Sequence, residues 1–244
     1  AVQDGAEKVA TLRTIAALHR ERGDRAAEAR THLRVLAMST RDASTLARLG
    51  ALYAETGERE RLGAVLALEL EGEPTPEKRR GTLLRLASAA RAKGDLEQSE
   101  AFLREVATAA TDDDPSPLLD AAFGLAELGR AREAVRLLRE GARGLGDPDR
   151  AALRGSAVER VYREAVRLAL RGLEDARVAL DAAVEGLDRV PGSSTLLVAF
   201  ETLALQLKDV DLAERTYGSL LERAMGPHGR QALAYRQGRW LEQV

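Results

Sequence analysis

The sequence predicts an all-α protein, an array of stacked antiparallel helix pairs that forms an α-solenoid. Apolar residues recur at i, i+3, i+4 and i+7 through most of the chain, whereas the period-two alternation of a β-strand never persists. Short turns that combine glycine with charged residues occur at Gly23, Gly57, Gly94 and Gly129. They are 34, 37 and 35 residues apart, and a period of this length is typical of a helical repeat.

The composition excludes several classes of protein. The 244 residues include 37 basic and 39 acidic side chains, so no strong net charge draws the chain to nucleic acid or to an anionic membrane. No apolar stretch reaches the roughly 18 residues of a membrane span, and the absence of cysteine removes disulfides and thiolate ligands. The chain starts at an alanine, shows no targeting signal and stops inside a helical pattern. We therefore expect a fragment of a longer protein, with a cytoplasmic location slightly favoured.

The first helix of each repeat is defined by its distance from the turn. Two weaker turns, at Gly172 and Asp209, continue the series after 43 and 37 residues. An aliphatic residue stands eleven positions before each turn: Leu12, Leu46, Leu83, Leu118, Val161 and Val198. A small residue, which lets the two helices of a pair approach closely, stands seven positions before it: Ala16, Gly50, Ala87, Ala122, Ala165 and Thr202.

The second helix of each repeat begins with a small or aliphatic residue and carries a larger one four positions later. With one residue of slack in the turn, the first set is Ala29, Leu62, Ser99, Ala134, Ala176 and Ala213. The larger set, expected in the core, is Leu33, Leu66, Leu103, Leu138, Leu180 and Tyr217. Proline-containing linkers close most repeats, because proline lacks the amide donor that would continue a helix. We expect one array over residues 1–244, with units 7–40, 42–73, 77–112, 116–146, 150–190 and 193–226 and a partial unit at 229–244.

The repeats resemble the tetratricopeptide repeat family. The resemblance is carried by the 34-residue period, by LGALYAETGE (49–58), by ELGRAREAVRLLREGA (127–142) and by the inter-repeat proline of RVPGSS (189–194). It implies a right-handed superhelix of about six antiparallel helix pairs plus a final partial repeat. The fifth and sixth repeats depart from the pattern, because Glu164 and Glu201 stand at a position that is usually aliphatic. A different register, or a related α-solenoid, is the alternative for these two repeats.

The resemblance also implies which residues meet a partner, since the first helices of this family line a concave surface. The inward positions lie ten, six and three residues before each turn. The candidate partner-binding residues at these positions are Arg13, Arg20, Leu84, Arg91, Leu119, Phe123, Tyr162, Val166 and Leu203. The predicted groove is basic and small-sided in the first two repeats and apolar from the third onward. The alternative interpretation is that the register is displaced and these residues belong to the core.

Other motifs are better explained by structure than by chemistry. The string GARGLGD (141–147) follows a helix, not a strand, and is interpreted as a helix end with its linker. The acidic segment TDDDPSP (111–117) is interpreted as helix capping, because Asp and Ser are preferred caps. The histidines His19, His32 and His228 lack metal-ligand spacing. The basic stretch on residues 130–143 is interpreted as a solvated face.

The sequence thus predicts a non-catalytic protein–protein interaction scaffold that binds a peptide or a partner helix, with no cofactor, no metal and no nucleic acid. The carboxylate clamp of some family members requires groove asparagines, and this chain contains no asparagine. One alternative is a structural spacer or self-assembly module, which could form a homo-oligomer. Another is a regulatory sensor domain of an enzyme or transcription regulator. The identity of the partner is not encoded in these patterns.

Overall fold

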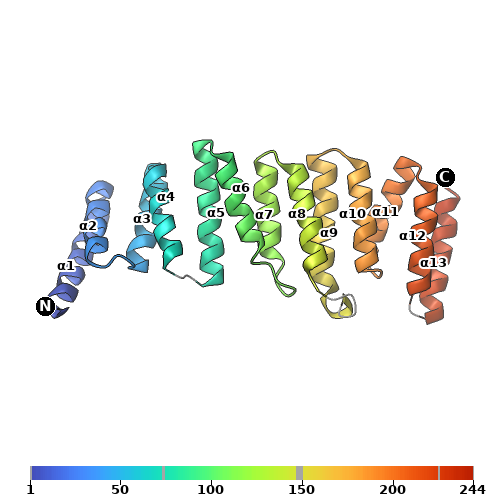
Figure 1. Cartoon of the computed structure of the whole chain (residues 1–244), viewed down its shortest axis with the longest axis horizontal. Coiled ribbons are helices and arrows are strands. Elements are labelled where there is room, and N and C mark those ends of the chain that lie inside the picture. Colours follow the sequence, from blue (N-terminus) through green and yellow to red (C-terminus); the bar gives the residue numbers. More distant parts are fainter. Residues whose placement is uncertain (1, 73–74, 147–150, 225, 244) are drawn as a thin grey trace. The chain divides into compact units, whose positions relative to one another are not determined.

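The computed structural model describes residues 2–72, 75–146, 151–224 and 226–243. Its described residues form α-helices joined by turns, with no strand among them (Figure 1). The chain divides into two compact bodies, a first body over Ala1–Phe102 and a second body over Leu103–Val244. The linker residues Pro74 and Pro148, and residue 150 at the expected start of the fifth repeat, lie outside the described residues.

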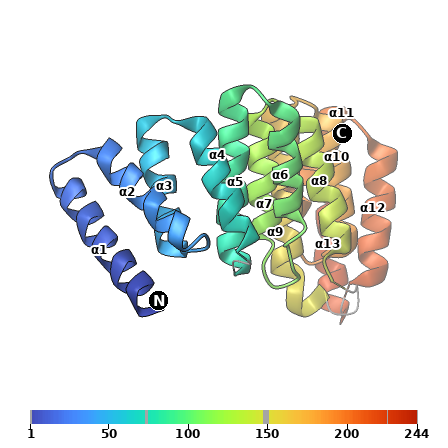
Figure 2. The ribbon, with the colours of Figure 1, turned by 60° about the vertical axis from the view of Figure 1, so that its left-hand side comes forward.

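The first body consists of helix pairs in which each helix packs against the next (Figure 2). Its helices are α1 (Val2–Glu21), α2 (Arg25–Met38), α3 (Ala43–Thr56), α4 (Arg59–Glu71), α5 (Pro76–Lys93) and the start of α6 (Leu96–Ala107). The core of the second pair is built from buried leucines and Tyr53, against which Leu62 packs. In the third pair the Ser99 hydroxyl of α6 donates to the Ala87 carbonyl of α5 at 2.8 Å.

The second body continues the same pattern of pairs. Its helices after α6 are α7 (Ser116–Glu127), α8 (Ala131–Gly144), α9 (Ala151–Gly172), α10 (Ala176–Arg189), α11 (Ser194–Leu207), α12 (Val210–Arg223) and α13 (Gly226–Leu241). Each helix contacts the next, and the first helices α7, α9 and α11 also contact one another in sequence. The second helices α10 and α12 do the same, so the body has two helical layers. The predicted all-α, tetratricopeptide-like array of helix pairs is confirmed.

The turns show that the expected register of the fifth and sixth repeats is wrong. The left-handed turn residue is glycine in the first four repeats, at Gly23, Gly57, Gly94 and Gly129. In the next two it is Glu174 (φ 53°) and Lys208 (φ 54°), not Gly172 and Asp209. The acidic residue that follows, Asp175 or Asp209, caps the second helix through its carboxylate.

A backbone hydrogen bond at each turn provides a common reference position for aligning all six repeats. The amide of the capping residue donates to a carbonyl five residues earlier, as from Arg130 to Leu125 and from Asp209 to Ala204. In the fifth repeat the span is six residues, from Asp175 to Ala169, because the turn holds one more residue. When the repeats are aligned on the residue whose carbonyl accepts this bond, the aliphatic position that the sequence assigned to Glu164 and Glu201 is occupied by Ala165 and Phe200. Ala165 and Phe200 are fully buried, so the fifth and sixth repeats conform to the apolar pattern.

The extra residue that was allowed between the turn and the second helix is also wrong in the first repeat. Leu33, expected in the core, is 45% exposed. Without slack, the positions five and nine residues after the turn are Glu28 and His32, and the Glu28 carboxylate is buried. Arg48 of α3 binds it bidentately, with Nε–Oε1 and Nη2–Oε2 distances of 2.7 and 3.1 Å. In the fifth repeat the same positions are Ala179 and Ala183, both fully buried.

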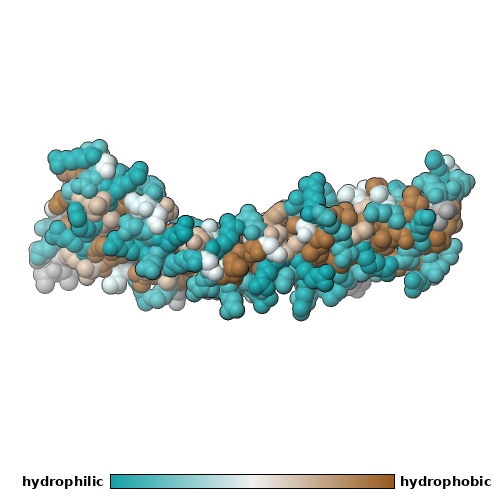
Figure 3. Space-filling view, turned by 90° about the horizontal axis from the view of Figure 1, so that it is seen from above, coloured by the Kyte–Doolittle hydropathy of each residue, from teal (hydrophilic) through white to brown (hydrophobic). Residues whose placement is uncertain are grey.

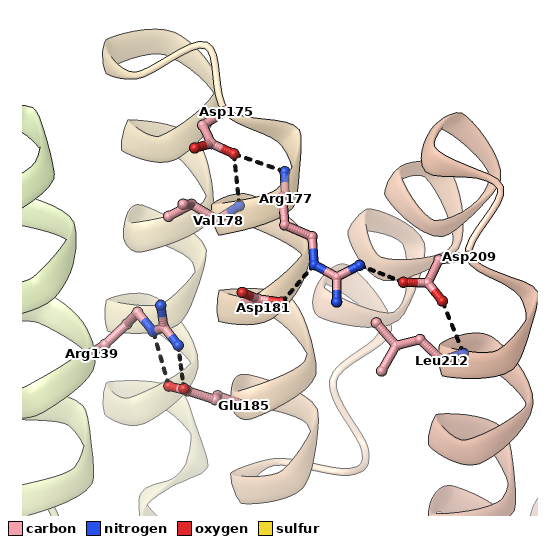
Figure 4. Close-up of polar contacts among 8 residues, drawn as sticks. All are labelled: Arg139, Asp175, Arg177, Val178, Asp181, Glu185, Asp209 and Leu212. Atoms are coloured by element: carbon pink, nitrogen blue, oxygen red, sulfur yellow. Dashed lines mark hydrogen bonds and ion pairs between the residues drawn. The ribbon is translucent and has the colours of Figure 1, made fainter.

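Ion pairs connect the second helices of the second body (Figure 4). Arg139 of α8 donates to Glu185 of α10, and Arg143 donates to the same carboxylate at 2.7 Å. Burial raises the pKa of Glu185, but the two arginines outweigh it and hold that pKa below its usual value. Arg177 of α10 contacts Asp181 and, across the gap to α12, Asp209. The arginines at 139 and 143 therefore join neighbouring repeats, rather than facing only solvent.

Candidate protein-interaction groove

The candidate residues of the first body lie at its surface. Arg13, Arg20 and Arg91 are exposed, and Leu84 is half-buried. Arg13 forms an ion pair with Asp42, whose carboxylate also accepts from Ser44 and from the Thr45 amide at the start of α3. Partial burial opposes this, but these donors lower the pKa of Asp42 to about 2. The charge of Arg13 is therefore already compensated within the chain.

A shallow hollow in the first body has walls of small side chains. It encloses about 450 Å³ and is lined by residues of α3, α4 and α5. Alanines, glycines and Ser88 dominate the lining, and Tyr53, which contributes to it, is buried. Arg85, which also lines it, is paired with Glu69. This hollow offers few large apolar contacts to a partner.

The second body places three of the candidate residues in its core. Tyr162, Val166 and Leu203 are buried, which matches the alternative interpretation of a displaced register, but Val166 also lines the groove described below. Leu119 and Phe123 remain on the surface of α7, Phe123 with 43% of its area exposed. The physical reason is the shift of one residue found at the turns, since successive helical residues point about 100° apart.

With the register corrected, other residues take the groove positions. In the fifth repeat they are Arg163, Arg167 and Leu170, and in the sixth they are Val198, Thr202 and Leu205. Leu170 is 40% exposed and Val198 52% exposed. The sequence signal that could have found them is the acidic cap after each turn, Asp175 and Asp209, because it marks the start of the second helix more reliably than a glycine does.

The fifth-repeat positions lie in a groove, which we call the α9 groove, between the first helices α7, α9 and α11, whereas Val198, Thr202 and Leu205 are not part of its lining. The groove encloses about 550 Å³. Its apolar lining is Leu119, Phe123, Val166, Leu170, Leu196 and Ala199. Its charged lining is Arg160, Arg163, Glu164, Arg167 and Arg171, all from α9. The groove therefore combines exposed hydrophobic surface with a row of positive charge.

The arginines of the α9 groove differ in how they are held. Arg167 binds Glu164, with an Nε–Oε1 distance of 2.9 Å, and its guanidinium lies 5.2 Å from the centre of the Phe123 ring. The hydrogen bond to Glu164 raises the pKa of Arg167. Within the described part of the chain, Arg160, Arg163 and Arg171 form no hydrogen bond or ion pair through their side chains. Among the described residues, these three positive charges therefore have no carboxylate partner.

A second hollow lies between α11 and α13 and encloses about 600 Å³. Its polar groups satisfy one another. The Glu201 carboxylate accepts from the Tyr217 hydroxyl and from Arg236 Nη2 at 2.6 Å, and Trp240 Nε1 donates to the Glu201 carbonyl at 2.9 Å. Burial, and then the bond to Glu201, raises the pKa of Tyr217. This network attaches α13 to the sixth repeat, which explains the glutamate that looked anomalous in the sequence.

Comparison with known proteins adds little to this description. No protein-family model matches the chain, and no curated protein matches it. Among solved structures, the TPR domain of P58(IPK) is similar over 98% of this chain and 67% of that chain, with 16% identity and a TM-score of 0.40. The chain has a tetratricopeptide-like repeat fold. That statement rests on the helix pairs, turns and layers described above.

The acidic segment and the glycine-rich string singled out in the sequence have structural roles within the described residues. The Asp114 carboxylate accepts from the Ser116 amide at 3.0 Å, at the start of α7, and Thr111 accepts from the Asp114 amide. The first four residues of the GARGLGD string form the end of α8, which stops at Gly144, and its last residue, Asp147, lies outside the described residues. His19 is half-buried and His228 is exposed. Over the described ranges, no group of three or more His, Asp or Glu side chains could hold a metal ion, and no helix is long and apolar enough to cross a membrane.

Proposed function

We propose that this chain is a non-catalytic interaction scaffold that binds a polypeptide segment of a partner in the α9 groove. The observation that carries the proposal is the exposure of Phe123 and Leu170 on the neighbouring first helices α7 and α9, both within the lining of this groove. Apolar surface that is contiguous and lies in a concave site is the usual mark of an interaction surface. Hydrophobic side chains also gather in patches on the face drawn in Figure 3.

The helices that form the walls of the groove are supported by the packed core of the second body. The helices α9 and α11 contribute the fully buried side chains of Tyr162 and Phe200 to the core, and the Phe200 ring packs edge-on against the ring of Tyr217. The second helices are connected by the ion pairs of Arg139 and Arg177. A preformed groove avoids most of the ordering cost of binding, so a short segment can bind with useful affinity.

The proposal is tested by selecting binders for the whole chain from a displayed library of random short peptides. We expect the selected peptides to bind the wild-type chain and to lose binding to the Phe123→Asp/Leu170→Asp variant. The matched control is Leu33→Asp/Met38→Asp, which places the same two charges on exposed apolar sites of α2. Circular dichroism establishes that each variant is folded.

Two results would overturn the proposal. Peptides that bind the groove variant as well as the wild type would place the interaction surface elsewhere. No selected peptide, together with a concentration-dependent mass in sedimentation equilibrium, would favour the self-assembly alternative.

A further inference from the structure

We propose that the segment bound in the α9 groove is acidic and extended, with carboxylates at alternate positions and large apolar residues between them. This inference rests on the proposed function, because it specifies the partner of the same groove. It is argued from the charge of the lining, the spacing of the arginines and the apolar wall opposite them.

The charge of the lining favours an acidic partner. The groove presents four arginines and one glutamate, and Glu164 is already bound by Arg167. The chain as a whole has a net charge of −2, so this positive charge is local and not a general property of the protein. Carboxylates are the groups that guanidinium binds with bidentate hydrogen bonds.

The spacing of the arginines accommodates an extended backbone. Arg160, Arg163, Arg167 and Arg171 lie three, four and four residues apart, which places them along one face of α9. The row is about 16 Å long at 1.5 Å per residue, and successive arginines are about one helical turn, 5.4 Å, apart along the helix axis. In an extended peptide, every second side chain points the same way and recurs after about 6.6 Å. Because arginine side chains are long and flexible, their guanidinium groups can reach carboxylates at the slightly wider peptide spacing.

The apolar wall accounts for the intervening residues. Leu119 and Phe123 of α7 flank the arginine row, and Leu170 is exposed beside it. In an extended segment whose carboxylates face the arginines, the alternate side chains are free to meet this wall. Single-stranded nucleic acid would also meet the arginines, but it requires aromatic platforms for successive bases, and Phe123 is the one aromatic residue in the described lining.

The test measures fluorescence anisotropy with short fluorescein-labelled peptides and the whole chain. The probe alternates glutamate with leucine. One comparison peptide replaces glutamate by lysine, another replaces leucine by serine, and an oligothymidine of similar length represents nucleic acid. We expect the glutamate–leucine peptide to bind most tightly, and its affinity to fall as salt is raised, because exposed charges are screened.

The decisive variant is Arg163→Glu, with Arg132→Glu as its matched control. Among the described residues Arg163 has no side-chain partner and is exposed in the groove, whereas Arg132 is exposed on the second helix α8. Both substitutions change the net charge by the same amount. We expect Arg163→Glu to raise the Kd of the glutamate–leucine peptide about tenfold, and Arg132→Glu to leave it within about twofold.

Each other outcome overturns the inference. Equal loss with Arg132→Glu would mean that general charge, not the groove, attracts the peptide. Tighter binding of the lysine peptide, the serine peptide or the oligothymidine would assign the groove to a different partner. If library peptides bind the groove while the acidic probe does not, the inference fails and the proposed function stands.

Discussion

The two bodies use the same repeat positions to build different surfaces. In the first body the hollow near α3 and α5 is lined mainly by alanine, glycine and serine. Of its two arginines, Arg85 is paired with Glu69 and Arg59 donates to the Ala92 carbonyl. In the second body the equivalent positions carry Phe123, Arg163, Arg167 and Leu170, and Arg163 is unpaired within the described residues. The comparison teaches that the repeat fixes where a groove lies, while a few outward side chains decide what it can bind.

The bodies also differ in how they place charge in their interiors. The first body buries the Glu28 carboxylate, which is 2% exposed, against Arg48. The second body keeps Glu185, the acceptor of Arg139, 27% exposed. A buried carboxylate depends strongly on its partner, whereas a solvated one does not.

The largest expected effect tests this difference. Arg48→Ala leaves Glu28 buried without its guanidinium, and we expect the free energy of unfolding to fall by about 3 kcal/mol. Arg139→Ala is the comparison in the second body, with an expected loss of about 1 kcal/mol, because Glu185 can be hydrated. Urea unfolding followed by circular dichroism measures both. Equal losses would show that the two pairs are equivalent.

The second prediction concerns glycines inside helices. A Cβ at Gly186 of α10 would lie 2.7 Å from Leu196 Cδ1 and 2.9 Å from Tyr162 Cβ. A Cβ at Gly50 of α3 would meet its nearest atom, Arg85 Nη1, at 3.5 Å. We expect Gly186→Ala to destabilise the chain by about 1–2 kcal/mol through overpacking. Gly50→Ala should stabilise it by about 0.5–1 kcal/mol, because alanine favours the helix. The same sign for both, measured by thermal unfolding, would contradict the tight packing assigned to the second body.

The third prediction compares the turns. Gly57 of the first body and Lys208 of the second both have a left-handed backbone. Gly57→Ala should lower stability by about 1 kcal/mol, whereas Lys208→Gly should raise it by about 0.5–1 kcal/mol, since glycine adopts this conformation without a Cβ clash. Chemical unfolding of the two variants against the wild type gives both values. No gain from Lys208→Gly would indicate that its turn is not strained.

The smallest expected effect is a pH dependence of the first body. Burial lowers the pKa of His32 from 6.5, as do Arg48 and Arg20, against the opposing influence of Glu28 and Asp42. A folded-state pKa below the unfolded one means that the unfolded chain binds more protons, so stability is full above pH 6.5 and declines as the pH falls below it.

We expect a decline of less than about 1 kcal/mol between pH 7.5 and pH 5.5, and expect His32→Gln to reduce it. Unfolding curves at the two pH values measure the change. His19→Gln is the control, because His19 lies outside the Glu28–Arg48 contact. A decline that is unaffected by His32→Gln would assign the pH dependence to other groups.

Much of the fold could be predicted from the sequence, and less of the site. The turns at Gly23, Gly57, Gly94 and Gly129 require a left-handed residue followed by a cap, and both features are local. Leu119 and Phe123, found from the same turns, do line the α9 groove. Arg163, Arg167 and Leu170 were missed because the fifth turn contains an additional residue. Of the residues assigned in their place, Tyr162 is in the core, and Val166 is buried but does line the groove.

The sequence by itself therefore determined the helices, their period and their pairing, because these depend on local periodicity and turn chemistry. Only the tertiary structure decided which face of α9 and α11 is buried, since a displacement of one residue rotates a helix by about 100° and exchanges core for groove. The tertiary structure also decided which side chains bind the carboxylates of Glu28 and Glu201. A carboxylate can lie in the interior only where a partner from another helix, Arg48 or Arg236, reaches it.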